Sequence, residues 1–106
     1  MPATSKRLEF LRKHTASGGA DAFAFYGLAM ELRALELHDE SLAAFGELRA
    51  KWPDYVPAYL MCGQMLEKIG KLDIAKEWLR AGIDAARTKG DAHALGELEA
   101  ALAALG

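Results

Sequence analysis

One pair of side chains has a spacing at which a metal ion could be bound. His93 and Glu97 are four residues apart, so on a helix they share one face and could both reach the same ion. A structural zinc site takes about four protein ligands, and no cysteine or second histidine is placed to complete the set. We therefore expect His93 and Glu97 to form an ion pair that stabilises a helix, and we expect neither a metal nor another cofactor.

A thiol and a pair of glycines are the other candidates for chemistry. Cys62, the single cysteine, falls at a packing position of a predicted helix, where a thiol behaves as a small hydrophobic group. No histidine or aspartate in the same part of the chain makes a recognisable relay with it. Gly18 and Gly19 are not followed by the lysine and hydroxyl residue of a phosphate-binding loop. Because no acid, base and nucleophile converge, the sequence predicts a protein that is not an enzyme.

The charges limit the classes of partner. The chain has 106 residues, with 13 basic and 15 acidic side chains and a formal net charge of −2. No overall field therefore draws it to nucleic acid or to an anionic membrane. One basic cluster lies near the N-terminus, and we interpret it as the solvated face of a helix; it comprises Lys6, Arg7, Arg12, Lys13 and His14. No apolar run approaches the ~18 residues of a membrane-spanning helix. We expect a cytoplasmic protein that binds neither nucleic acid nor membranes.

The elements that carry these residues are predicted to be helices. Hydrophobic residues make up 52% of the chain, and only three prolines interrupt it. The apolar spacing predicts six helices, over residues 6–14, 22–36 or 37, 40–51, 57–69, 74–89 and 92–105. The predicted N-terminal caps are Thr4 or Ser5, Asp21, Asp39, Asp73 and Asp91, and Gly70 is predicted to follow the fourth helix in a left-handed conformation.

Part of the chain repeats its own plan. A shift of 34 residues brings together positions of the same size and polarity: Phe25 and Tyr59, Leu28 and Cys62, Ala29 and Gly63, Leu32 and Leu66, Ser41 and Ala75, Phe45 and Leu79. This period, built from two helices, resembles the tetratricopeptide repeat (TPR), whose pattern is W-x₂-L-G-x₂-Y…A-x₃-F…P. The first unit follows the pattern with Phe25-x₂-Leu28-Ala29-x₂-Leu32, Ser41-x₃-Phe45 and Pro53.

The resemblance implies an all-α fold of the α-α superhelix type in a single domain. Repeat 1 would cover residues 22–55 and repeat 2 residues 56–89, between an N-terminal helix with a glycine-rich connector (1–19) and a C-terminal helix (91–105). Arg87 stands where the first repeat has Pro53, so we expect the fifth helix to continue to about Lys89. His93, Gly96 and Ala100 do not fit the repeat pattern, and we interpret the sixth helix as a cap over the apolar edge of repeat 2.

In the TPR family, the first helix of each repeat lines a concave groove that binds a peptide. On this chain the groove positions would be Phe23, Tyr26, Met30 and Arg33 in repeat 1, and Leu60, Met61, Gln64 and Lys68 in repeat 2. The carboxylate clamp of the family uses lysine, asparagine and arginine side chains. Here Tyr26 and Met30 stand where the clamp would have lysine and asparagine, and Leu60 and Gln64 stand at the matching places of repeat 2. The resemblance therefore implies no acidic EEVD-type ligand.

An apolar ligand fits the groove positions better. Phe23, Tyr26 and Met30 form an apolar stripe beyond the one that the repeat needs for its own packing. The resemblance thus implies an adaptor or scaffold that binds an apolar peptide or helix of another protein. The alternative stays open: a structural homo-oligomer whose groove is filled by its own N-terminal helix or by a second copy.

Overall fold

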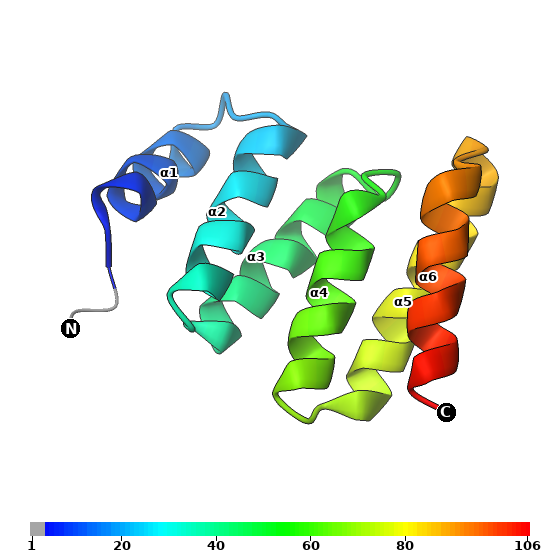
Figure 1. Cartoon of the computed structure of the whole chain (residues 1–106). Helices are drawn as coiled ribbons and strands as arrows, with labels where there is room; N and C mark the ends of the chain where they lie inside the picture. The colour runs from blue at the N-terminus through cyan, green and yellow to red at the C-terminus, as the bar shows by residue number, and fades with distance from the viewer. Residues whose placement is uncertain (1–3) are drawn as a thin grey trace. The chain divides into compact units, whose positions relative to one another are not determined.

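The computed structural model describes residues 4–106, and within that range it contains six α-helices and no strand (Figure 1). The helices are α1 (Lys6–Ala16), α2 (Ala22–Ala34), α3 (His38–Lys51), α4 (Pro57–Lys68), α5 (Leu72–Lys89) and α6 (Ala92–Ala104). The contacts divide the chain into two compact units, with α1 to α3 in the first and α4 to α6 in the second. The prediction of an all-α helical repeat fold is confirmed. No helix of the described part has the length and apolar character needed to cross a membrane.

Three of the predicted N-terminal caps are confirmed. The side chains of Ser5, Asp21 and Asp91 each accept a hydrogen bond from a backbone N–H in the first turn of the helix that follows. The caps predicted at Asp39 and Asp73 are wrong, since both residues already lie inside the first turn of α3 and α5. There their charge still stabilises the helix, because the N-terminal end of a helix is the positive end of its dipole.

The helices α2 and α4 end in the same way, 34 residues apart. After α2, Glu36 has a φ of 61°, and the N–H of Leu37 donates to the carbonyl of Leu32 at 2.9 Å. After α4, Gly70 has a φ of 81°, and the N–H of Lys71 donates to the carbonyl of Leu66 at 2.9 Å. This hydrogen bond and the left-handed residue before it define a Schellman motif. The motif ends α2 at Ala34, earlier than predicted, because Glu36 adopts a conformation that usually requires glycine.

In the first unit, α2 packs against both α1 and α3. Phe25 and Leu32 of α2 are buried, and Phe45 of α3 is completely buried. Where α2 and α3 cross, the Ser41 hydroxyl donates to the carbonyl of Ala29 at 2.8 Å. Small side chains at a crossing let two backbones approach closely, and here the serine also satisfies its own hydroxyl.

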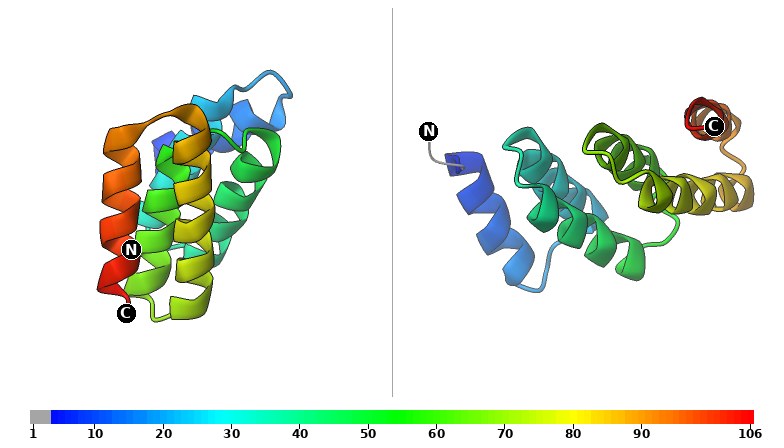
Figure 2. Two further views of the ribbon diagram at one scale, coloured as in Figure 1. Left: turned by 90° about the vertical axis from the view of Figure 1, so that its right-hand side faces the viewer. Right: turned by 90° about the horizontal axis from the view of Figure 1, so that it is seen from below.

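In the second unit, α5 packs against α4 on one side and α6 on the other, and α4 and α6 also touch each other (Figure 2). A Cβ placed on Gly63 of α4 would lie 2.7 Å from Cδ2 of Leu79 on α5. A Cβ placed on Gly82 of α5 would lie 2.5 Å from Cβ of Tyr59 and 2.9 Å from Cδ2 of Leu98 on α6. These two glycines therefore set how closely the three helices approach.

The sixth helix packs against α5 and touches α4, as predicted for a cap over repeat 2. Leu98 is completely buried, whereas His93, Gly96 and Ala100, the residues at the repeat positions, are exposed. The helix therefore turns a different side toward its neighbours than α2 and α4 do. The predicted extension of α5 to Lys89 is also confirmed, and Gly90 follows it with a φ of 75°.

Candidate functional site

The predicted groove residues belong to two units, four to each. On α2, Phe23 is 70% exposed, while Tyr26, Met30 and Arg33 are half-buried. A guanidinium nitrogen of Arg33 lies 3.9 Å from the Met30 sulfur. Burial raises the pKa of the Tyr26 hydroxyl, and the positive charge of Arg33 opposes part of this rise. Tyr26 is therefore a neutral hydroxyl at physiological pH, so this side of α2 is an aromatic and thioether surface with one cation.

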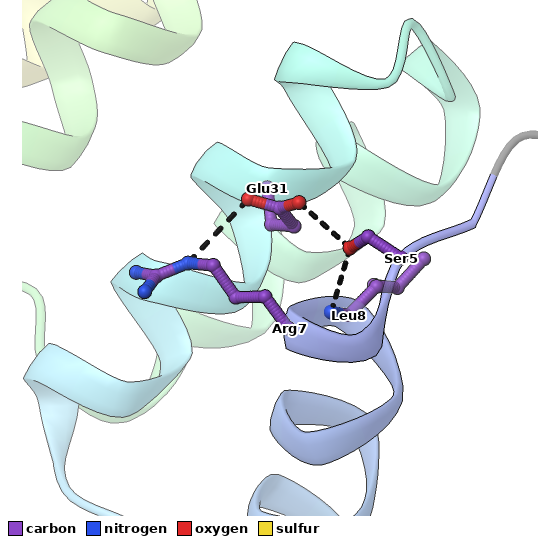
Figure 3. Close-up of polar contacts among 4 residues, drawn as sticks. All are labelled: Ser5, Arg7, Leu8 and Glu31. Carbon is purple, nitrogen blue, oxygen red and sulfur yellow. Dashed lines mark hydrogen bonds and ion pairs between the residues drawn. The ribbon is translucent and has the colours of Figure 1, made fainter.

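The helix α1 lies against a neighbouring side of α2 (Figure 3). Leu8 and Leu11 are buried, and a Cβ placed on Gly27 would lie 3.5 Å from Cδ2 of Leu11. Glu31 accepts a hydrogen bond from the Ser5 hydroxyl at 2.8 Å and pairs with Nε of Arg7 at 3.4 Å. Gly27 and Glu31 lie about 100° around the helix from Tyr26 and Met30. Within this unit α1 therefore contacts Gly27 and Glu31, and Phe23 remains exposed.

The basic cluster of α1 is partly used to hold the unit together. In addition to the pair between Arg7 and Glu31, Arg12 pairs with Glu40 of α3 at 2.9 Å. All five residues of the cluster are exposed, as predicted for a solvated helix face, and the ion pairs of Arg7 and Arg12 lie on the surface of the unit. Sequence reasoning also missed Phe10, which is 65% exposed and stacks on His14 with ring centroids 5.7 Å apart. The signal was available, since Phe10 lies four residues before His14 on the predicted helix.

A pocket of about 260 Å³ opens between the N-terminal halves of α4 and α6 in the second unit. Two of the predicted groove residues, Leu60 and Met61, line it; Gln64 and Lys68 are exposed on α4 and do not. The other lining residues are Val56, Pro57, Asp91, His93, Ala94, Glu97 and Leu98. The pocket wall is mostly apolar, and its polar members all come from α6 or its cap.

The polar side of the pocket has a defined arrangement. One carboxylate oxygen of Asp91 accepts from the N–H of Ala94 at 3.0 Å and so caps α6. Nε2 of His93 lies 3.4 Å from a carboxylate oxygen of Glu97, so the two side chains form the predicted pair on one face of the helix. The side chain of His93 is 88% exposed and that of Glu97 51%. Sequence reasoning placed this pair on the helix surface but did not place it beside Leu60, because nothing in the repeat pattern shows which side α6 turns toward α4.

The remaining candidates for chemistry are the thiol of Cys62 and a metal site. Cys62 is completely buried at the packing position predicted for it. Over residues 4–106, no group of three or more histidine, cysteine, aspartate or glutamate side chains is arranged to hold a metal ion.

The same helical arrangement occurs in solved structures. The crystal structure of a tetratricopeptide repeat domain protein from Salinibacter ruber aligns with a TM-score of 0.74 and 34% sequence identity, over 81% of this chain and 96% of that one. This chain belongs to the tetratricopeptide repeat family. A solution structure of a tetratricopeptide repeat domain protein from the same organism aligns with a TM-score of 0.76, at 34% identity over 80% of this chain and 86% of that one.

A further solved structure shares the fold. The solution structure of a protein from Bordetella parapertussis aligns with a TM-score of 0.80 over 96% of this TPR chain and 89% of that one, at 24% identity. No family model and no curated protein matches the sequence. The TPR fold is a helical repeat module that is generally used for protein interaction.

Proposed function

We propose that this TPR domain is an adaptor or scaffold module that binds an apolar segment of another protein. The observation that carries the proposal is the apolar pocket between α4 and α6, which is lined by the predicted groove residues Leu60 and Met61. Its volume of about 260 Å³ is enough for a large aliphatic or aromatic side chain. Burying one such side chain contributes roughly 1.5–3 kcal/mol, so one pocket gives a weak contact that a longer segment would strengthen.

The exposed aromatic side chain of α2 supports the same proposal. Phe23 is 70% exposed, and few large apolar side chains of the described chain are as accessible. It lies beside Met30 on the stripe that the repeat does not use for packing, and methionine adapts its shape to different apolar partners. We propose that Phe23, Tyr26, Met30 and Arg33 form the contact surface of the first unit.

Affinity capture followed by mass spectrometry tests the proposal with matched variants. Phe23→Glu and Leu60→Glu place a charge on the two proposed surfaces, and Ile74→Glu places the same charge on an exposed position of α5. We expect proteins captured by the wild type and by Ile74→Glu to be lost from Phe23→Glu and Leu60→Glu. Circular dichroism of all variants checks that the helices are retained. Capture of the same proteins by all four would refute the proposed surfaces.

A further inference from the structure

We propose that the pocket between α4 and α6 selects an apolar side chain that has lysine or arginine next to it in the partner's sequence. This inference rests on the proposed function and specifies the chemistry of the ligand. It follows from the charges around the pocket. Among the residues that line it are two carboxylates, those of Asp91 and Glu97, and no lysine or arginine.

Two helices begin at this pocket, and the positive ends of their dipoles offset part of the negative charge of the carboxylates. Each helix start is equivalent to roughly half a positive charge, and at α6 the carboxylate of Asp91 already neutralises it by accepting from Ala94. At α4 the first helical residue is Pro57, which has no N–H. The next two N–H groups, of Ala58 and Tyr59, donate to backbone carbonyls at 3.3 and 3.1 Å. These two groups are therefore not free to bind an anion.

Glu97 leaves the pocket edge negative. Its side chain is half exposed and lies 3.4 Å from the imidazole of His93 on the same helix. A cation of the ligand can approach it from solvent without losing all of its hydration. The apolar wall made by Leu60, Met61 and Leu98 would hold the neighbouring side chain. A ligand with acidic residues beside its apolar side chain would instead meet the like charge of Glu97.

The selectivity is opposite to that of a carboxylate clamp. A clamp offers lysine to an acidic tail, whereas here the charged residues at the pocket are acidic. A segment with related chemistry occurs in this chain: on α1, exposed Phe10 lies near Lys6 and Lys13 in the sequence. A second copy docking through α1 is therefore a competing occupant, and the experiment must separate it from a foreign segment.

A nuclear magnetic resonance titration of the full chain with short synthetic peptides tests the inference. Each peptide has a central leucine in a glycine and serine background, flanked by lysines, by glutamates or by serines. The methyl group of Met61 and the amide of Ala94 report on occupation of the pocket. We expect the lysine peptide to bind about tenfold more tightly than the glutamate peptide, with the serine peptide between them.

Two variants on α6 give a matched comparison. Glu97→Gln removes a charge at the pocket, and we expect it to reduce the preference for lysine over glutamate roughly threefold. Glu99→Gln removes a charge that pairs with Arg87 at 3.5 Å and does not line the pocket, so the preference should not change.

The outcomes distinguish this inference from the proposed function. Equal binding of the lysine and glutamate peptides, with shifts at Met61, would overturn the charge selectivity and leave apolar binding in place. No shift with any peptide would overturn both. If the Met61 signal moves with protein concentration alone, and Phe10→Ser abolishes that movement, the occupant is a second copy, and the inference of a foreign segment is wrong.

Discussion

The substitution Gly82→Ala should loosen the three helices that form the pocket. The added Cβ would lie 2.5 Å from Cβ of Tyr59, an atom next to the backbone of α4, and 2.9 Å from Cδ2 of Leu98. The Tyr59 side chain is held in place, since its hydroxyl donates to the carbonyl of Pro53 at 2.6 Å and its ring lies 5.8 Å from that of Trp78. Relief of the clash therefore requires the backbones of α4 and α5 to separate.

The size of the effect follows from two opposing terms. Alanine is favoured over glycine in a helix interior by about 1 kcal/mol. Overpacking a tight interface costs about 1–3 kcal/mol, and a contact with a Cβ atom belongs at the upper end of that range. The expected net loss is about 2 kcal/mol of unfolding free energy. Because Leu98 lines the pocket, peptide binding should also weaken.

Urea unfolding followed by the fluorescence of Trp78 measures the loss. A Trp52→Phe background removes the other tryptophan, which belongs to the first unit. The control is Gly96→Ala on α6, where an added Cβ has no heavy atom within 4 Å, so the helix propensity of alanine should stabilise the unit by about 1 kcal/mol. If Gly82→Ala unfolds at the same or a higher urea concentration than Gly96→Ala, the argument from close packing is refuted.

Three further predictions concern the first unit. Glu36→Gly should raise its unfolding free energy by about 1 kcal/mol in urea unfolding, because glycine adopts the left-handed φ of 61° without the strain of a side chain; an unchanged midpoint would contradict this. Glu31→Ala should remove the contacts to Ser5 and Arg7, so hydrogen exchange of the α1 amides should speed up while that of α3 is unchanged. For Tyr26, the folded pKa lies above the ordinary value of 10.0, so the folded chain keeps a proton that the unfolded chain loses. The free energy of unfolding should be constant below about pH 10 and fall at higher pH by at most about 1.4 kcal/mol per pH unit. The variant Tyr26→Phe should lack this fall.

Most of the fold could be predicted because helix packing determines the size of the side chains at the repeat positions. Ala29 and Gly63 lie where two helices cross closely, and the hydroxyl of Ser5 caps α1 as expected for a serine before a helix. The end of α2 could not be predicted in the same way. Glu36 carries no signal for a left-handed conformation, and it adopts one because the hydrogen bond from Leu37 to Leu32 closes the helix there.

The candidate site was predictable on one of its two walls only. Leu60 and Met61 follow from their positions on the first helix of a repeat, since periodicity fixes which side of α4 they occupy. The α6 wall does not follow, because α6 departs from the repeat and its orientation depends on tertiary packing of Leu98 against α5. Sequence reasoning therefore found His93 and Glu97 as a pair but not as part of the pocket.

The departure of α6 from the repeat is also the reason that the pocket can be acidic. Shifted by 34 residues, Gly63 falls on Glu97. At Gly63 even a methyl group would lie 2.7 Å from Leu79, because α5 crosses α4 at that point. A glutamate at the corresponding position of α6 is incompatible with a helix packed in the same way, since a close crossing needs a small residue. A carboxylate fits at this position only on a helix that is not crossed closely there. The charge of Glu97, which we infer to select the ligand, is therefore possible because α6 departs from the repeat pattern.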